Sequence, residues 1–579
     1  MKGMMKDFVQ SFPWAIILIL GISLLVAIML VPFMQFYFIR KPINSSKTDN
    51  RHKKISFLDY IQKEYNKLLD LCFKWPRTTL LIGVCSVIAG ILLMKNLPQQ
   101  LMPTADRNQF AVEIYLPTGS AIEKTTAIAD SLEHILKNDN RITSITSFHG
   151  CASPRFHTAY APQTGGTNYA QFIVNTKDTH STEELLDEYS SKYANYFPDA
   201  FVRFKQLSYS QAIYPIEIRI SGTDLDTLKS EANKILSLMR NTSGVTYAST
   251  DLNEPQASTK IQIKEDEASR LGVSNLGIET TLAMRYGEGL PIANVWEDDY
   301  DVKVVLKGDN ADNANNTDLE NENIPVAGGL SYVPLRQIAD IIPIWKDGQL
   351  VRRNGIYTIT VQCELERHLN AMEITNEIKE KIENLHISPN VNITYGGELE
   401  ESEENLPTIM SGLVIASLII FFILLMHFHK INISLLIFAS MSLCLFGAAT
   451  GVIIHGLSFS VTCVLGLVSL MGIIVRNGII MIDYAEELRM KEKLHVREAI
   501  YLSAQRRMRP IFLTSAAASM GVIPMTLGKS GLWMPMGTVI CYGTLITMVF
   551  LLTVLPVSYW LIFRGSTQQR NKVKQLEME

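Results

Sequence analysis

Hydrophobic and polar residues are separated into long blocks along this chain of 579 residues. Seven apolar blocks reach the length of roughly 17 to 25 residues that an α-helix needs to cross a bilayer. Six of them contain no Asp, Glu, Lys or Arg, and the fifth contains only Arg476 and Asp483. The blocks are Phe8–Ile39, Thr78–Met94, Asn405–Phe428, Ile431–Ile454, Val461–Tyr484, Pro510–Gly528 and Ser530–Phe563. The sequence therefore predicts an α-helical polytopic membrane protein with about seven transmembrane helices.

Lysine and arginine gather in two of the intervening segments, 40–77 and 485–509. Short loops rich in these residues stay in the cytoplasm, so both segments are expected there, together with the C-terminal tail. The long segment 96–404 then lies on the outer face. The N-terminus would also lie outside, yet no signal peptide precedes the first block. We therefore expect the chain to start partway through a membrane protein.

The outer segment alternates strand and helix patterns. Residues 98–210 contain two consecutive β-α-β patterns, the split β-α-β arrangement of an α+β sandwich. The same pattern starts again in 211–255 and finishes in 351–402. Residues 256–350, which interrupt it, are expected to form a separate lobe with a helix at Ala268–Arg285.

These patterns divide the chain into membrane helices, outer α+β units and cytoplasmic segments. The expected divisions are 1–40, 41–77, 78–97, 98–210, 211–255 with 351–402, 256–350, 403–563 and 564–579. Segment 403–563 holds five of the membrane helices. Segment 41–77 holds an amphipathic helix at Ile55–Trp75, which we expect to lie flat in the membrane interface.

Composition and motifs narrow the function. The chain is 47% hydrophobic, only 19% charged, and carries a net charge of −4, which is too small for nucleic-acid binding. It has no phosphate-binding GxxxxGK[ST] loop, no GxSxG and no HExxH, so we expect neither an enzyme nor a nucleotide site. The histidines show no metal-ligand spacing, and we expect no metal site and no cofactor. Cys151 and Cys363 lie outside the membrane; a disulfide is one alternative, and two unpaired core cysteines is the favoured one.

Arg476 lies within an otherwise apolar block, where a charge costs several kcal/mol and needs a partner. A guanidinium stays protonated in proteins, so Arg476 cannot itself carry a proton to and fro. It can, however, hold a carboxylate ionised and release it when that carboxylate is protonated. Asp483 lies seven residues further on, about 10 Å along the helix axis and near the cytoplasmic end. We infer that Arg476 faces carboxylates from outside this chain; the alternative is an arginine that only packs or reaches the interface.

Two further sites are candidates on pattern alone. Thr514 and Ser515 follow the expected helix start at Pro510 by one turn, where their hydroxyls either relay protons or bond to the preceding turn. The loop between the first two β-α-β units is rich in glycine and aromatic residues. Phe156, Tyr160, Gly165 and Gly166 are therefore candidates for a loop that gates a cleft for apolar ligands, with an ordinary exposed loop as the alternative.

Three motifs resemble those of the resistance-nodulation-division (RND) efflux permeases. The helix Gly466–Glu487, with the run Val-Arg-Asn-Gly at 475–478, resembles their tenth membrane helix. Arg506–Ser515, followed by Gly521-Val-Ile-Pro524, resembles the entry to their eleventh helix. Leu101–Phe110 with Leu116-Pro-Thr-Gly119 resembles the start of their first C-terminal porter subdomain. The resemblance covers nearly the whole chain but only half of such a permease, because the seven helices match helices six to twelve.

The resemblance implies proton-driven export by a homotrimer in the bacterial inner membrane, with a large periplasmic region. It places Arg476 at the basic position of the proton relay and Arg507 and Thr514 at its helix-eleven positions. Asn477 is a further relay candidate, and Asp483 a weaker one. The two relay aspartates belong to helix four, which this chain lacks. We therefore expect a companion N-terminal half as partner, besides a periplasmic adaptor and an outer-membrane channel, with H⁺ as the coupling ion.

The substrate class is inferred from the methionines. Members that export heavy metals use methionines in the porter cleft, but here the porter region holds only Met102, Met239, Met284 and Met372, with no cluster in the sequence. We therefore expect hydrophobic or amphiphilic substrates, such as drugs, detergents or bile salts. Heavy-metal export is the first alternative. An inactive truncated remnant, or a membrane scaffold that transports nothing, is the second.

Overall fold

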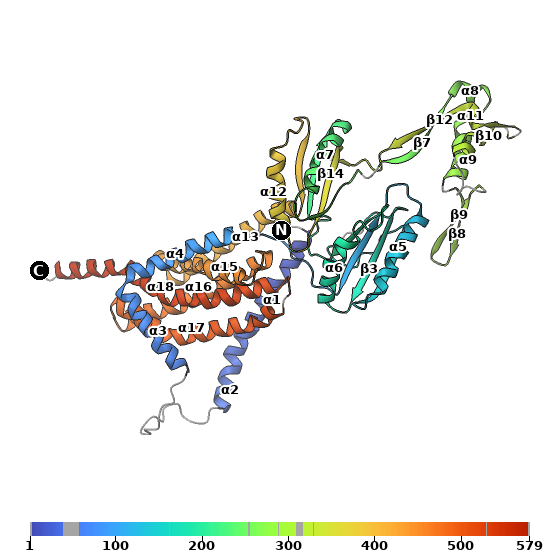
Figure 1. Cartoon of the computed structure of the whole chain (residues 1–579). Helices are drawn as coiled ribbons and strands as arrows, with labels where there is room; N and C mark the ends of the chain where they lie inside the picture. The colour runs from blue at the N-terminus through green and yellow to red at the C-terminus, as the bar shows by residue number, and fades with distance from the viewer. Residues whose placement is uncertain are drawn as a thin grey trace.

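The structure, a computed structural model, describes residues 3–38, 57–160, 163–252, 255–287, 289–308, 316–327, 329, 331–528 and 530–576. Long helices gather at one end, two α+β units lie beyond them, and a smaller lobe is furthest from the helices (Figure 1). Residues 41–56, the first part of the predicted linker 41–77, lie outside the described residues.

Seven helical stretches in the described residues are long and apolar enough to cross a membrane. Their helices are α1 (Gly3–Leu25) with α2 (Val31–Phe38), α4 (Pro76–Lys95), α13 (Glu398–Phe428), α14 (Ile431–Ser440) with α15 (Cys444–Ile454), α16 (Val461–Lys491), α17 (Val496–Leu527) and α18 (Met534–Leu576). A π-helical turn, Val26–Leu30, joins α1 to α2, and a 3₁₀ turn, Met441–Leu443, joins α14 to α15. We call α4 and α13–α18 the bundle.

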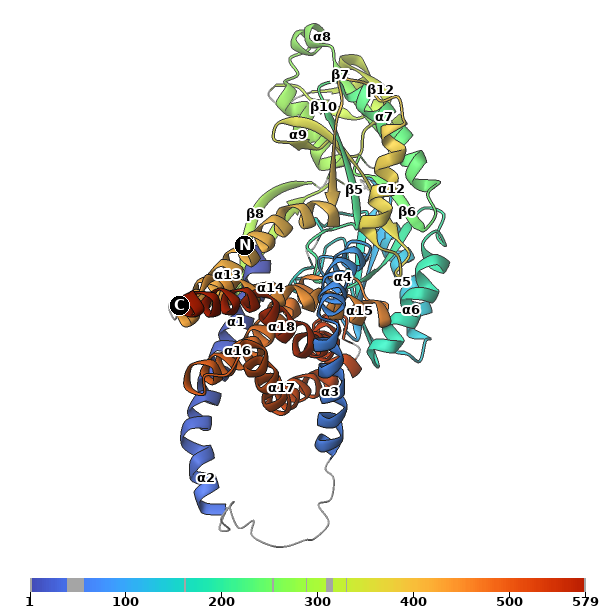
Figure 2. The same cartoon turned by 90° about the vertical axis from the view of Figure 1, so that its left-hand side faces the viewer.

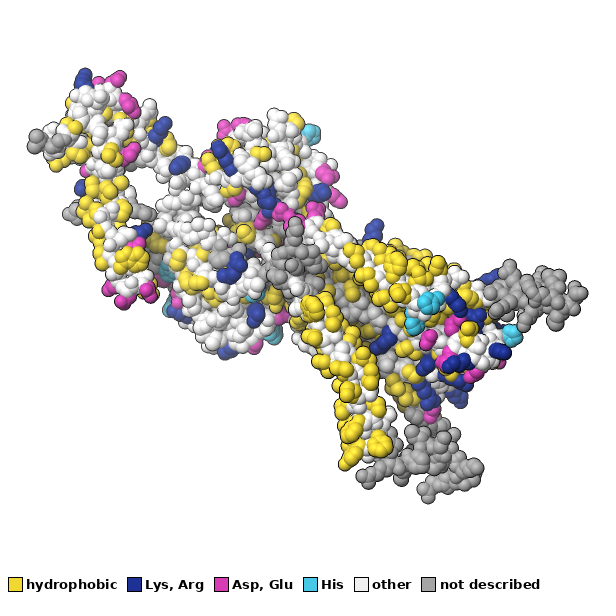
Figure 3. All heavy atoms as spheres, turned by 180° about the vertical axis from the view of Figure 1, so that it is seen from behind, with side chains coloured by type: hydrophobic (Ala, Val, Ile, Leu, Met, Phe, Trp, Pro, Cys, Tyr) yellow, Lys and Arg dark blue, Asp and Glu magenta, His cyan; other side chains and the backbone are white. Residues whose placement is uncertain are grey.

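The bundle packs around α18, which contacts α15, α16 and α17 and has the most buried apolar window of the seven stretches. By contrast, the apolar window of α1–α2 has no buried residue, and α2 diverges from the bundle (Figure 2). Hydrophobic side chains cover α1–α2 and one side of the bundle, whereas Lys, Arg, Asp and Glu gather at the end away from the α+β units (Figure 3). That distribution suits an apolar layer around the helices and a basic cytoplasmic end.

Helix α17 differs from the sequence expectation. α17 starts at Val496 rather than at Pro510, so Thr514 lies in mid-helix and not one turn from its start. The arginine-rich stretch before Pro510 consists of helix formers, and α3 (Phe57–Lys74) packs against it: Arg509 pairs with Asp59 at 2.5 Å.

Tyr65 and Leu69 on the apolar face of α3 are buried against the bundle, so this face packs on protein. Its location in the membrane interface stays a prediction.

The first α+β unit consists of β1 (Gln109–Tyr115), α5 (Ile122–Lys137), β2 (Ile142–His149), β3 (Tyr169–Thr176), α6 (Thr179–Tyr193) and β4 (Phe201–Gln206). Its antiparallel sheet has the order β2-β3-β1-β4, with Phe110 of β1 opposite Val174 and Gln206. Alternation along β1 turns Phe110, Val112 and Ile114 into the core with α5 and α6. Ala111, Glu113 and Tyr115 therefore face the other side of the sheet.

The second unit repeats this plan. It consists of β5 (Ile216–Gly222), α7 (Leu225–Arg240), β6 (Val245–Thr250), β13 (Arg352–Arg353), β14 (Ile356–Leu365), α12 (Ala371–Glu383) and β15 (Asn392–Gly397). The sheet order is β13-β14-β5-β15, with β6 also paired to β14. Ile216, Ile218 and Ile220 alternate into its core. The chain then runs directly from β15 into α13.

The lobe is joined to the second unit by the antiparallel pair β7 (Gln256–Ile263) and β12 (Ala339–Lys346). Its other elements are α8 (Glu265–Arg270), α9 (Asn275–Tyr286), β8 (Leu290–Glu297), β9 (Tyr300–Leu306), α10 (Asn316–Glu320), β10 (Asn323–Pro325), β11 (Tyr332–Pro334) and α11 (Leu335–Ile338). The single helix expected at Ala268–Arg285 is wrong. Gly272 has φ +71°, which ends α8, and the Ser274 hydroxyl then accepts a hydrogen bond from Gly277 N–H and starts α9.

A close helix contact gives a test of the bundle. A Cβ on Gly90 of α4 would lie 2.5 Å from the backbone nitrogen of Phe446 in α15, whereas nothing lies within 4 Å of a Cβ on Gly412 of α13. Gly90→Ala should therefore destabilise the purified chain by about 1–3 kcal/mol, through overpacking. Gly412→Ala, the matched control, should be neutral or stabilise it by up to about 1 kcal/mol, through helix propensity. Thermal unfolding in detergent measures both, and equal midpoints for the two variants would contradict the packing.

Candidate functional site

Arg476 lies on an exposed face of α16. Among the described residues, no carboxylate lies within ion-pairing distance of its guanidinium, and no hydrogen bond of its side chain is found. Nothing lies within 4 Å of a Cβ on Gly472, one turn earlier on the same face, so the surface there is open. Asp483 instead lies with its Oδ1 3.8 Å from Nε2 of His427 on α13. The expected counter-charge of Arg476 is thus not supplied by the described part of this chain.

The other relay candidates make different contacts. Asn477 is buried, and its Nδ2 donates a hydrogen bond to Oγ of Ser515 at 3.3 Å, which ties α16 to α17. Thr514 is exposed, and its hydroxyl donates to the Ile511 carbonyl at 3.2 Å. This is the bond to the preceding turn that the sequence offered as the alternative to a proton relay. Arg507 stacks on Tyr484 with 4.4 Å between its Cζ and the ring centroid. The structure therefore brings together Asn477 and Ser515, while Arg476 and Thr514 face outward.

A second candidate site is a cavity of about 530 Å³ between the two α+β units, which we call the cleft. Both units contribute ionisable residues to its lining. They are Asp187, Arg203 and Lys205 from the first unit, Glu364, Glu366, Arg367 and His368 from the second, and Glu398 at the start of α13. The lining also includes the aromatic residues Phe201, Phe204 and Tyr247.

A buried ion network forms the floor of the cleft. Arg203 of β4, whose side chain is 2% exposed, donates from Nη1 to Glu113 Oε2 at 3.0 Å and also pairs with Glu364 of the second unit. Tyr115 and Tyr160 donate hydrogen bonds to the Glu113 carboxylate at 2.8 and 2.5 Å. Burial alone raises the pKa of Glu113, but the Arg203 guanidinium, then Lys205 and the two hydroxyls, outweigh it and lower this pKa to about 2.

For the neighbouring Lys205, burial outweighs the nearby carboxylates in setting the pKa. Burial, with the repulsion of Arg203 second, lowers the pKa of Lys205 to about 8. Its charge therefore depends on pH just above neutrality. Sequence reasoning missed this network, although a signal was present: Glu113, Arg203 and Lys205 are charged residues inside two apolar strands.

A second ion pair spans the cleft nearer the surface. Arg367, in the turn between β14 and α12, donates from Nε and Nη2 to the two carboxylate oxygens of Asp187 on α6, both at 2.7 Å. Arg367 Nη1 lies 3.5 Å from Glu183, and His368 Nε2 lies 3.7 Å from Asp187. The hydrogen bonds from Arg367 lower the pKa of Asp187 below its usual value. Two ion pairs, one deep and one outer, thus join the units across the cleft.

The predicted gating loop lies elsewhere. Phe156, Tyr160, Gly165 and Gly166 are not among the residues that line the cleft. Tyr160 is buried; its hydroxyl donates a hydrogen bond to Glu113 and accepts one from Gln171. Phe156 packs on it with ring centroids 4.9 Å apart. A Cβ on Gly165 would lie 2.8 Å from Cα of Cys151, so the loop folds closely on itself. The loop covers the polar side of the first sheet, which a count of glycines and aromatics cannot reveal.

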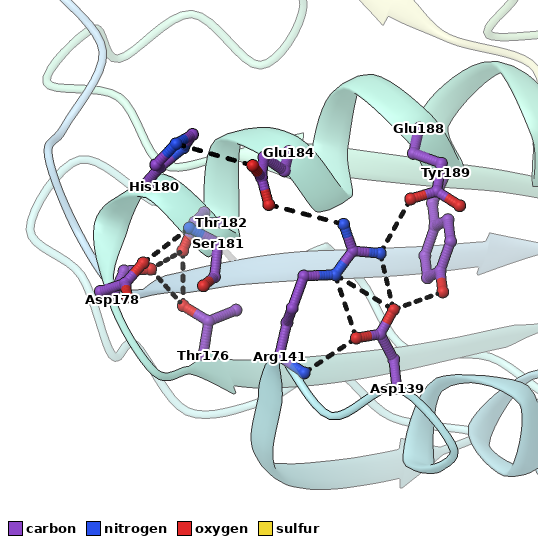
Figure 4. Close-up of polar contacts among 10 residues, drawn as sticks. All are labelled: Asp139, Arg141, Thr176, Asp178, His180, Ser181, Thr182, Glu184, Glu188 and Tyr189. Atoms are coloured by element: carbon purple, nitrogen blue, oxygen red, sulfur yellow. Dashed lines mark hydrogen bonds and ion pairs between the residues drawn. The ribbon is translucent and has the colours of Figure 1, made fainter.

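A separate polar network braces the edge of the first unit (Figure 4). The Arg141 guanidinium binds Asp139 at 2.7 Å and Glu188 at 2.8 Å, and Tyr189 donates to Asp139 at 2.7 Å. Asp178 caps α6 by accepting from the N–H of Ser181 at 2.7 Å. These residues do not line the cleft, so this network is structural.

Two groups of residues with potential ligand atoms bear on the expectations from sequence. Asp130, Glu133 and His149 bring one potential ligand atom each within 4.8 Å of one another, although the histidines showed no metal spacing in the sequence. The sequence hides this group because His149 is distant along the chain; Lys137 and Ser147 already bind the Glu133 carboxylate. Cys151 and Cys363 are both unpaired, as favoured, but Cys151 is exposed and only Cys363 is a core residue.

Comparison with known proteins places the chain. The sequence model described as the AcrB/AcrD/AcrF family matches residues 1–563. Protein HelA of Legionella pneumophila and the cobalt-zinc-cadmium resistance protein CzcA of Cupriavidus metallidurans are each 22% identical over 97% of this chain and 54% of their own length. The crystal structure of a heavy metal efflux pump shares the fold, with a TM-score of 0.74 at 20% identity over 88% of this chain and 52% of that one. The chain spans about half the length of the curated relatives it matches.

The floor of the cleft gives a test of its ion network. Arg203→Met leaves Glu113 buried without its counter-charge and should destabilise the first unit by about 3–5 kcal/mol. Adding Glu113→Gln should restore much of the loss. Because folding lowers the pKa of Glu113 from 4.5 to about 2, its contribution is complete above pH 4.5 and disappears as the pH falls towards 2. Denaturant unfolding at several pH values measures this, and additive effects of the two substitutions would contradict the pairing.

Proposed function

The chain belongs to the AcrB/AcrD/AcrF family of RND efflux permeases, and on this premise we propose that it is one half of a pump that exports divalent transition-metal cations. The observation that carries the substrate class is the lining of the cleft, which offers four carboxylates and an imidazole. Oxygen and imidazole ligands suit cations such as Zn²⁺ and Co²⁺. The names of CzcA and of the heavy metal efflux pump agree with this choice.

The lack of a methionine cluster in the porter region does not argue against metal export in general. Thioether ligands select soft ions such as Cu(I), so the lack of a methionine cluster argues only against those ions. Met102 and Met239 are buried in two different apolar clusters, and none of the four porter methionines lines the cleft. In the closed cleft Arg203 and Arg367 neutralise Glu364 and Asp187, so an entering cation competes with these guanidinium groups.

Export of amphiphilic compounds, expected from the sequence, is the second candidate. The observation in its favour is the group of aromatic rings in the cleft, Phe201, Phe204 and Tyr247. Phe201 and Tyr247 stack on each other across the cleft, however, so one face of each ring is already covered.

The need for a companion half follows from Arg476. A guanidinium within the hydrocarbon layer costs several kcal/mol without a counter-charge, and the exposed face around Gly472 leaves room for another helix. Carboxylates on that helix, titrated by the proton gradient, drive the pump in this proposal. The assembly is a trimer in the inner membrane that works with a periplasmic adaptor and an outer-membrane channel.

The substrate class is tested by tolerance of cells that make the chain with its companion, which co-purification identifies. We expect a gain in tolerance to Zn²⁺, Co²⁺ or Cd²⁺ and none to dyes or bile salts. His368→Ala with Glu366→Gln should reduce metal export by about tenfold, as loss of metal-site groups does. Glu380→Gln, an exposed glutamate of α12 that does not line the cleft, is the matched control. Tolerance to bile salts or dyes alone would favour the second candidate.

The relay is tested at Arg476. Arg476→Ala should abolish export yet leave co-purification with the companion intact, because it removes the charge that holds the carboxylates ionised. Arg476→Lys should keep part of the activity. Val468→Ala, on the same exposed face of α16, is the control and should export normally. Export at the normal rate by Arg476→Ala would rule out the relay role.

A further inference from the structure

One short segment, residues 98–106 between α4 and β1, contacts two loops of the bundle and both α+β units. On the bundle side it pairs with the loop that precedes α16. Phe459 N–H donates to the Pro98 carbonyl at 2.7 Å, and Gln100 N–H donates to the Phe459 carbonyl at 3.1 Å. Val461, the first residue of α16, donates to the Leu101 carbonyl at 3.2 Å. The helix that carries Arg476 is therefore hydrogen-bonded at its outer end to this segment.

The same segment also holds the loop between α17 and α18. The carboxylate of Asp106 accepts two hydrogen bonds at Oδ2, from Ser530 Oγ at 2.8 Å and from Gly531 N–H at 2.7 Å. Hydrogen bonds to a charged acceptor are about twice as strong as neutral ones. Asp106 thus fixes the outer end of the helix that carries Arg507 and Thr514.

On its other side the segment continues into the walls of the cleft. Ala105 N–H donates to the Leu207 carbonyl at 2.8 Å, directly after β4, the strand that carries Arg203. The Gln99 carbonyl accepts from Asn370 Nδ2 at 2.9 Å, and Asn370 caps α12 just after the turn that carries Arg367. Leu207 is four positions from Arg203, and Asn370 is three positions from Arg367. The segment is therefore hydrogen-bonded close to both ion pairs that span the cleft.

The surroundings allow the segment to move with these helices. Leu101 and Met102 are packed with Val461 and Val464 of α16 and with Ile409 of α13. A second cavity of about 430 Å³ lies beside Gln99, Gln100 and Leu101, against α13. The segment is thus joined to α16 by packing and hydrogen bonds, and beside its contact with Ile409 a cavity separates part of it from α13.

We propose that segment 98–106 transmits movement of α16 and α17 to the cleft, and that Asp106 is the positioning residue that makes the α17–α18 loop move with β4. This inference rests on the proposed function, because it assumes that protonation moves α16 and α17. A shift of either helix end pulls on the segment through hydrogen bonds, and the segment pulls on β4 and α12. The two ion pairs across the cleft then open or close together.

The experiment measures whether closure of the cleft changes when the charge of Arg476 is removed. Phe201→Cys with Tyr247→Cys places a cysteine pair where two rings stack across the cleft, in a chain with Cys151→Ser. Oxidative cross-linking in membranes of cells that also make the companion reports closure. We expect Arg476→Ala to change the cross-linking yield by about fivefold or more, the lower end of coupling between distant sites. In an Asp106→Ala chain the same substitution should leave the yield unchanged.

Further variants of this chain distinguish a loss of coupling from a loss of folding. Asp106→Asn keeps a carbonyl acceptor and should retain most of the response, and Ser530→Ala removes one of the two bonds and should retain part of it. Arg107→Ala, the exposed neighbour, should respond fully. A full response in Asp106→Ala and Ser530→Ala overturns the inference and leaves the proposed function intact. No effect of Arg476→Ala in the otherwise native chain overturns the relay and the inference together.

Discussion

A guanidinium in a hydrocarbon layer must be neutralised by a nearby counter-charge, and this constraint organises what the chain can do. Arg476 lies in the middle of a membrane-spanning helix, on a face that the described part of the chain leaves open. The same face carries Gly472, whose missing side chain permits close approach of a helix. Buried side chains concentrate on α14–α16 and α18, whereas α4, α13 and α17 expose most of their apolar windows. The described part of the chain therefore presents a charged membrane helix whose counter-charge it does not supply.

The two α+β units show a second electrostatic constraint. Glu113, Arg203 and Glu364 are held in a low-dielectric interior, where each charge is stable only while its partner is present. Two sheets that belong to different folding units thereby share one ion network. An opening of the cleft must separate Arg203 from Glu364 and Arg367 from Asp187, so its energy depends on what replaces these pairs. Lys205, with a pKa of about 8, adds a charge that responds to pH.

The sequence predicted the local elements well and their assembly less well. Periodicity located the strands and helices of both α+β units because an inward-facing residue recurs at every second or every third to fourth position. It misplaced the start of α17 at Pro510, because proline usually begins or breaks a helix whereas here it lies within one. It also joined α8 and α9, because the positive φ of Gly272 is not visible as a pattern. Sequence also could not place the candidate gating loop, which does not line the cleft, because composition does not show which surface a loop covers.

The sequence alone determined the apolar spans, the two repeated α+β units and the isolated arginine in the membrane, because each follows from side-chain type and spacing. The RND resemblance followed from short motifs of the same kind. Only the tertiary structure decided which distant charges meet: Glu113 with Arg203 and Glu364, Arg367 with Asp187, and Asp106 with the α17–α18 loop. These contacts join residues 90 to more than 400 positions apart, and such separations leave no periodic trace in the sequence. Packing of one unit on another selects them, through burial and hydrogen bonding that exist only in the folded chain.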